Sequence, residues 1–193
     1  MSGFFGKDDI VKYELIASLL ALSCALSAAQ DSTRATIARP VNDISINLLG
    51  DASLFSLGYE RLFICNPWLF LTEKTAVGYD QEFNASLLGS PPPLKNYLTI
   101  TQHITGNFGK GICFFELGLG AAVIAGNTGH NFLYYPVVGF RLQPAKTKWR
   151  PNFRAFWCIP FYGAMKIYDY TRSDGTGPEP LSIPVGVSTG LCF

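Results

Sequence analysis

The chain has 193 residues, of which 48% are hydrophobic, 14% aromatic and only 15% charged, and its formal net charge is +1. A soluble domain usually carries about 25% charged residues, and a nearly neutral chain gives no electrostatic reason to expect a nucleic acid as partner. After the N-terminal region, no segment has the roughly 18 uninterrupted apolar residues that a membrane helix needs. Together with 19 glycines and short alternating segments, this composition favours a transmembrane β-barrel.

The N-terminal region has the pattern of an export signal. Residues 15–29 (LIASLLALSCALSAA) form an apolar run that ends in small residues, which predicts a signal peptide over 1–29 that is cleaved before Gln30. Two alternatives stay open. The run could be a buried helix of a soluble protein, or a lipoprotein signal around Cys24, although the run continues past that cysteine. Residues 30–42 are expected to form a polar leader.

The rest of the chain, 43–193, alternates large apolar residues with small or polar ones, which is the pattern of strands with one apolar face. The last strand shows it most clearly, since Val185 and Val187 share a face with Leu191, and Gly186 shares the other with Ser188. The pattern predicts an all-β fold, an eight-stranded antiparallel up-and-down transmembrane barrel. We place its strands at 43–50, 53–64, 69–81, 96–105, 111–124, 132–143, 151–161 and 183–193.

The connections between these strands alternate in length. Links after even-numbered strands are short, at 65–68, 106–110 and 144–150, whereas 82–95 and 162–182 are long and follow odd-numbered strands. Short periplasmic turns and long external loops are typical of outer-membrane barrels. This arrangement puts the C-terminus on the periplasmic side and makes the two long loops candidates for binding an extracellular ligand.

Four segments of the predicted barrel stand out: LGYERLF at 57–63, FELGLG at 115–120, VGFR at 138–141 and VSTGLCF at 187–193. On these segments the chain resembles the small outer-membrane β-barrel proteins of the OmpA/OmpX-like architecture. The resemblance implies an outer-membrane location, contact with its lipids, and insertion by the barrel assembly machinery, which would read the terminal Phe193 as its signal. It implies little about activity, because this architecture includes adhesins, structural anchors and enzymes.

Four charged residues fall on the small-residue face of their strands and are predicted to point into the barrel: Glu60, Glu116, Arg141 and Arg154. The interior of an eight-stranded barrel is just wide enough for side chains to fill. Because buried charges need partners, we expect a structural ion-pair cluster that plugs the lumen. A path for protons or ions through the same groups is the alternative.

His103 and His130 are the two histidines of the chain. In the alternation of its strand, His103 falls on the inner face, which predicts a hydrogen bond in the lumen. His130 is expected to be solvated in a turn. The order His103, Thr105, Glu116 resembles the His-x-Ser and Glu arrangement of outer-membrane lipid A deacylases, in which a histidine oriented by a carboxylate activates a hydroxyl. Threonine in place of serine and the inward face both depart from that arrangement.

Cysteines and aromatic residues give weaker signals. The cysteines at 65, 113, 158 and 192 lie on separate predicted strands without ligand spacing, so we expect wall-filling side chains and no metal site. Aromatic residues near strand ends predict girdles at the membrane interfaces; they are Trp68, Trp149, Tyr97, Tyr134, Tyr135, Tyr162 and Phe193. A sugar-binding platform of Tyr162, Tyr168 and Tyr170 is the alternative in the last loop.

One residue is out of place in this scheme. Glu73 has outward parity, which predicts either a bulge near Lys74 or a membrane-facing part of the strand that begins later.

No nucleotide-binding glycine loop, metal cluster or coherent catalytic triad occurs in the sequence. We therefore expect a non-enzymatic outer-membrane barrel without a cofactor, with a plugged lumen and a structural or surface-interaction role. Two alternatives come from other classes: a lipid A-modifying enzyme, and a secreted lipocalin-like barrel whose apolar face is turned inward to bind a ligand.

Overall fold

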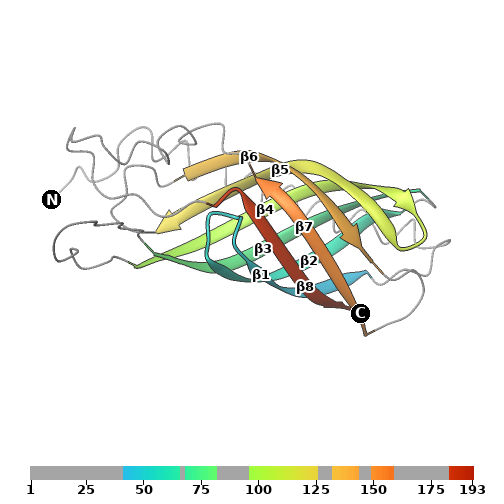
Figure 1. The fold of residues 1–193 in the computed structure, drawn as a ribbon, viewed down its shortest axis with the longest axis horizontal. Coiled ribbons are helices and arrows are strands. Elements are labelled where there is room, and N and C mark those ends of the chain that lie inside the picture. Colours follow the sequence, from blue (N-terminus) through green and yellow to red (C-terminus); the bar gives the residue numbers. More distant parts are fainter. Residues whose placement is uncertain (1–40, 66–67, 82–95, 126–131, 144–148, 159–182) are drawn as a thin grey trace, which may run out of the picture. The chain divides into compact units, whose positions relative to one another are not determined.

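The fold is described from a computed structural model of the chain. The description covers residues 41–65, 68–81, 96–125, 132–143, 149–158 and 183–193. Within them, eight antiparallel strands form one closed barrel in chain order, and β1 pairs with β8 (Figure 1). The predicted fold class, an eight-stranded antiparallel up-and-down barrel, is confirmed. The part of the chain that the structure describes has no helix that could span a membrane.

The strands are β1 (Asn42–Leu48), β2 (Phe55–Cys65), β3 (Leu69–Gln81), β4 (Asn96–Lys110), β5 (Cys113–Ala125), β6 (Phe132–Leu142), β7 (Arg150–Cys158) and β8 (Val185–Cys192). All eight predicted strands are present, and the barrel belongs to a compact unit, Ala38–Phe193. The predicted signal peptide, both long loops, His130, Tyr162, Tyr168 and Tyr170 lie outside the described residues.

The end of β4 differs from the prediction. The sequence placed a link at 106–110, but β4 continues to Lys110, and Gly111 and Ile112 alone connect it to β5. Gly111 takes a positive φ of 71°, which a glycine adopts without strain. The predicted link includes the glycines at 106 and 109. Gly109 instead lies within the strand, where an added Cβ would come 3.0 Å from the Phe114 Cα of β5.

The barrel wall has two chemically different faces. Large apolar side chains point outward along every strand; Leu119 and Phe140, for example, are 67% and 68% exposed. Polar and charged side chains point inward and are buried, as Thr99 and Glu116 illustrate. This orientation is the reverse of a soluble barrel, in which the apolar face lines the interior.

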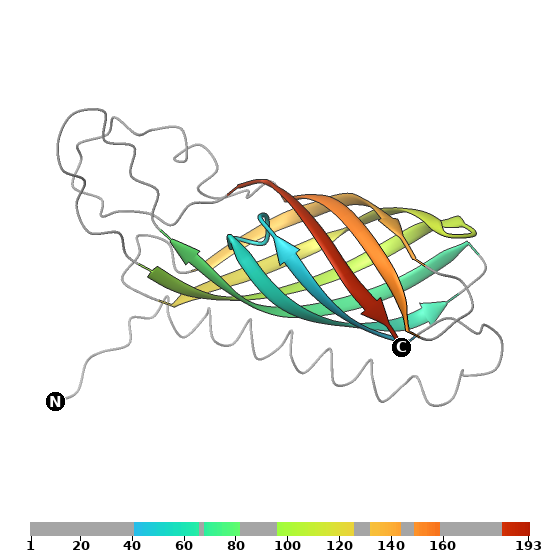
Figure 2. The same ribbon diagram turned by 60° about the horizontal axis from the view of Figure 1, so that its bottom comes forward.

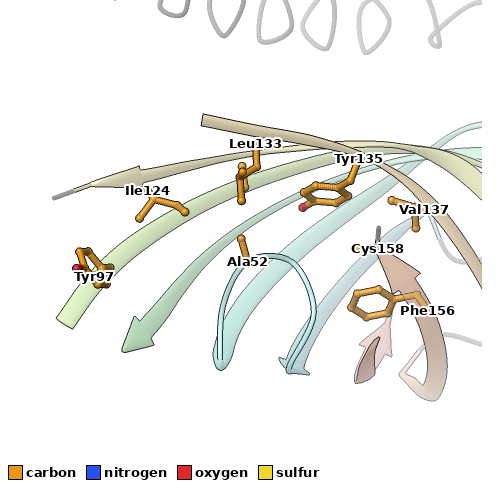
Figure 3. Packing of buried hydrophobic residues seen from close by; sticks show 9 residues of the cluster. Ala52, Tyr97, Ile124, Leu133, Tyr135, Val137, Phe156 and Cys158 are labelled. Carbon is orange, nitrogen blue, oxygen red and sulfur yellow. The ribbon is translucent and has the colours of Figure 1, made fainter. Parts of the chain in front are cut away.

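Two apolar layers lie inside the barrel, at opposite ends of the strands. The larger layer, near the β1–β2 turn, is formed by Ala52, Tyr97, Ala122, Ile124, Leu133, Tyr135, Val137, Phe156 and Cys158 (Figure 3). The smaller, near the β4–β5 turn, contains Leu62, Phe70 and Phe114, and the rings of the last two pack edge to face. The predicted place of Tyr97 and Tyr135 in an outward girdle is therefore wrong. Both have inward parity and are buried.

The barrel closes between its first and last strands (Figure 2). The amide of Asn42 donates to the carbonyl of Phe193 at 3.0 Å, and the amide of Phe193 donates back at 2.8 Å. The Phe193 ring stacks on Trp149 with ring centroids 5.3 Å apart. The terminal aromatic residue is thus part of the seam that closes the barrel.

Glu73 has the predicted outward position in the alternation of β3, although it is only 9% exposed, and the predicted bulge near Lys74 is wrong. Pairing of β3 with β4 is regular from Leu69 to Gln81. The irregularity lies instead in β2, between Leu62 and Ile64. The Glu73 carboxylate lies opposite Arg61 in the register and accepts a hydrogen bond of 2.5 Å from the Gln102 amide. A hydrogen-bonded carboxylate is less costly on an apolar wall than a free one.

Candidate functional site

The polar interior between the two apolar layers is the candidate site, and all four charged residues predicted for it are there. Arg141 donates to Glu60 through both Nη atoms, with Nη2 2.6 Å from Oε2. The Nε atom of Arg154 lies 2.6 Å from Oε2 of Glu116. The two ion pairs are linked, because Nη2 of Arg141 is 3.6 Å from Oε1 of Glu116. All four side chains are buried.

The wall geometry explains this pairing. Arg141 and Arg154 face each other in the register of β6 and β7, so their like charges are neighbours. Glu60 on β2 and Glu116 on β5 reach them from other parts of the wall. Each guanidinium thus has its own carboxylate, as charges buried in a low-dielectric interior require.

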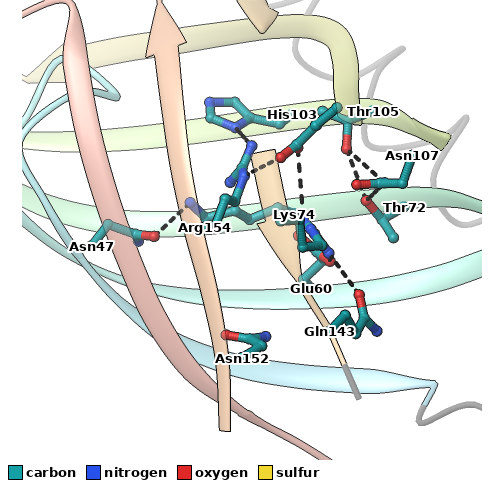
Figure 4. A network of polar contacts seen from close by, with 12 residues as sticks. Asn47, Glu60, Thr72, Lys74, His103, Thr105, Asn107, Gln143, Asn152 and Arg154 are labelled. Atoms are coloured by element: carbon teal, nitrogen blue, oxygen red, sulfur yellow. Dashed lines mark hydrogen bonds and ion pairs between the residues drawn. The ribbon is translucent and has the colours of Figure 1, made fainter. Parts of the chain in front are cut away.

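A second ion-pair group was not predicted. The Asp51 carboxylate accepts from Nζ of Lys74 at 3.0 Å and lies 2.9 Å from Nε2 of His103. Lys74 also donates to the amide oxygen of Asn47 at 2.7 Å (Figure 4). Strand parity could have identified Lys74, because it is adjacent to the outward Glu73. Nothing in the local sequence places Asp51, which lies in the β1–β2 connection and not on a strand.

The β1–β2 connection folds into the barrel end. Leu49, Asp51 and Ala52 have φ angles of 60°, 52° and 52°, and Gly50 has 67°. A left-handed conformation costs a residue with a Cβ about 1–2 kcal/mol. Gly50 is needed here, since an added Cβ would lie 2.7 Å from the Phe156 ring. The turn therefore carries strain, while the Asp51 carboxylate at its tip is fully buried.

The turn is held in place by electrostatics. Burial alone would raise the pKa of the Asp51 carboxyl, but the facing His103 and Lys74 hold this pKa well below its usual range. The carboxylate is therefore ionised and ion-paired inside the barrel.

His103 lies at the junction of the two ion-pair groups. Its Nε2 is 3.1 Å from the Tyr135 hydroxyl, and its Nδ1 is 3.4 Å from Nη2 of Arg154. The carboxylate beside His103 is that of Asp51, whereas Glu116 is engaged by Arg154. The hydroxyl of Thr105 lies 2.9 Å from that of Thr72. The order of residues that resembles a lipid A deacylase thus lies inside the barrel, with a different carboxylate next to the histidine.

Asp51, His103 and Cys158 are the described residues that could hold a metal ion. Their ligand atoms lie within 4.8 Å of one another, and carboxylate, imidazole and thiolate are donors that zinc accepts. Cysteine spacing could not reveal this group, because the three residues come from distant segments. Lys74 contacts the same carboxylate and Arg154 the same imidazole, so two cations oppose a divalent ion there.

Three of the cysteines have described side chains, and each of them is a free thiol. Cys113 is an exposed free thiol, and Cys158 and Cys192 are buried free thiols on the inner face.

A polar hollow lies beside the first ion pairs and is too narrow to admit a water molecule. It is lined by Asp43, Ser45, Glu60, Arg141, Asn152, Arg154 and Ser188. Chemically, this interior can hold charges in fixed positions, but it has no open channel at this point.

Comparison with protein-family models, curated proteins and solved structures found no match to this chain.

Proposed function

We propose that this protein is a non-enzymatic outer-membrane β-barrel with a lumen plugged by its own side chains. The observation that carries the proposal is the outward apolar face. Leu57, Leu119 and Phe140 are more than half exposed, and similar side chains project from all eight strands. A soluble monomer rarely exposes so continuous an apolar surface, whereas a barrel in a bilayer requires one.

The interior supports a structural role for the lumen charges over a path for ions. Each of Arg141 and Arg154 is ion-paired, and the hollow beside them admits no water. Apolar layers lie on both sides of this network. A lipocalin-like binder would need an apolar cavity, and the polar inner face argues against that alternative.

The partners in this proposal are the lipids of the outer membrane and the barrel assembly machinery. The loops 82–95 and 162–182 are the proposed place for an extracellular ligand, because long loops of such barrels lie outside the cell. The role would be structural or one of surface interaction.

Fractionation of cells tests the location. The protein should be recovered with outer membranes and should migrate faster on gels before heating than after, because a folded barrel resists unfolding by detergent. Recovery as a soluble periplasmic monomer would contradict the proposal.

Removal of Phe193 tests the assembly signal. We expect much less membrane-inserted protein, since the deletion removes the terminal aromatic residue, its stacking on Trp149 and both backbone hydrogen bonds to Asn42. Those contacts are worth roughly 1 kcal/mol each. Phe193→Tyr is the matched control, because it keeps a terminal ring; equal insertion of the deletion variant and this control would count against the prediction.

A further inference from the structure

The Asp51 carboxylate is bound in the barrel as a ligand would be. One oxygen, Oδ2, accepts from Nζ of Lys74 at 3.0 Å, and the other, Oδ1, lies 2.9 Å from Nε2 of His103. Oδ1 also lies 3.8 Å from the Cys158 thiol. These donors belong to β3, β4 and β7, so three separate strands converge on one carboxylate.

The donors are held independently of Asp51. Lys74 is fixed by the Asn47 amide oxygen at 2.7 Å, and His103 contacts the Tyr135 hydroxyl at 3.1 Å and Arg154 at 3.4 Å. All of them lie on paired strands of a closed barrel. The residues that contact the carboxylate thus belong to the barrel wall itself.

The carboxylate, by contrast, belongs to the strained connection between β1 and β2. Asp51 lies in a turn in which three residues with a Cβ have positive φ angles. Outside its own hairpin, the connection is held by a hydrogen bond of 2.9 Å from the Leu54 amide to the Tyr79 carbonyl of β3 and by Ala52, which packs in the larger apolar layer. Loss of the Asp51 contacts would release backbone strain, so the turn is the part of this site that can leave.

We propose that Lys74, His103 and Cys158 form a binding site for a small carboxylate, which Asp51 occupies as a tethered ligand and which a free carboxylate can enter when the turn moves out. The class of ligand follows from the contacts of Asp51. Its carboxylate is planar, each of its two oxygens has its own donor, and its single negative charge lies next to one lysine. A free ligand competes with a tethered one, whose effective concentration is on the order of millimolar, so binding to the native protein is weak.

Asp51→Gly with acetate as the probe tests this site. The substitution removes a CH2–COO− group, for which acetate is the free equivalent, and glycine tolerates the positive φ. Urea unfolding of the full chain in detergent micelles, followed by tryptophan fluorescence, is measured in sodium acetate and in sodium chloride of equal ionic strength. We expect acetate to shift the unfolding midpoint of the variant toward that of the native protein, with saturation.

Ala52→Gly is the matched control, because it relieves strain at the neighbouring position and keeps the carboxylate. Its unfolding midpoint, like that of the native protein, should differ far less between acetate and chloride than that of Asp51→Gly, because the tethered carboxylate competes with acetate. If Asp51→Gly fails to fold in chloride, the site predicts that acetate restores the folded fraction. Identical curves in both salts, or an equal acetate effect in Ala52→Gly, would overturn the proposal.

Discussion

Replacing Glu116 with Gln is expected to lower the free energy of unfolding by about 3 kcal/mol, the scale for breaking a buried ion pair. The carboxylate is fully buried, 2.6 Å from Nε of Arg154, and it also faces Arg141. A neutral amide leaves the buried Arg154 guanidinium without its countercharge. Urea unfolding in phospholipid vesicles measures the loss.

Glu73→Gln is the control for Glu116→Gln, because it makes the same chemical change at another carboxylate with little exposure, on the opposite face of the wall. We expect a small effect there, since Glu73 accepts from an amide and not from a buried guanidinium. A path for ions predicts a different outcome: Glu116→Gln would fold well and change single-channel conductance in planar bilayers. That result would mean that the lumen conducts ions and is not plugged.

Replacing Leu119 with Arg is expected to destabilise the barrel in vesicles by about 2–4 kcal/mol, the cost of a cation on the lipid face near the bilayer midplane. Leu119 lies in the middle of β5 and is 67% exposed on the outer face. In water the same exposed position would tolerate arginine within about 0.5 kcal/mol. The sign and size of the effect therefore report what surrounds the wall.

Leu119→Phe is the matched control for this substitution, because it keeps an apolar side chain at the same place. Unfolding free energies of the two variants should differ strongly in vesicles. Equal stability of the arginine and phenylalanine variants would mean that the outer face meets water.

The fold could be predicted because alternation is a local property of the sequence. In β5, for instance, Leu117 and Leu119 alternate with Gly118 and Gly120, so the strand and its two faces follow from the residues themselves. The end of β4 could not be predicted, because Gly109 is needed for close approach to a neighbouring strand, and a sequence does not distinguish that use of glycine from a turn.

The site could be predicted only in part. Parity places Glu60, Glu116, Arg141 and Arg154 inside, but their division into two pairs depends on which strands face each other across the barrel. Asp51 lay beyond prediction for a different reason. Its burial results from left-handed backbone angles in a turn and from cations on distant strands, and neither is a local feature.

The central claim is that the outer face meets lipid, and Trp157 tests it most directly. This residue is 54% exposed on the outer face of β7. In a Trp68→Phe, Trp149→Phe background it is the single fluorophore of its type, since the chain has three tryptophans. In vesicles of brominated phospholipid its fluorescence should be strongly quenched, and aqueous acrylamide should have little effect. Quenching by acrylamide with no effect of the brominated lipid would contradict the account.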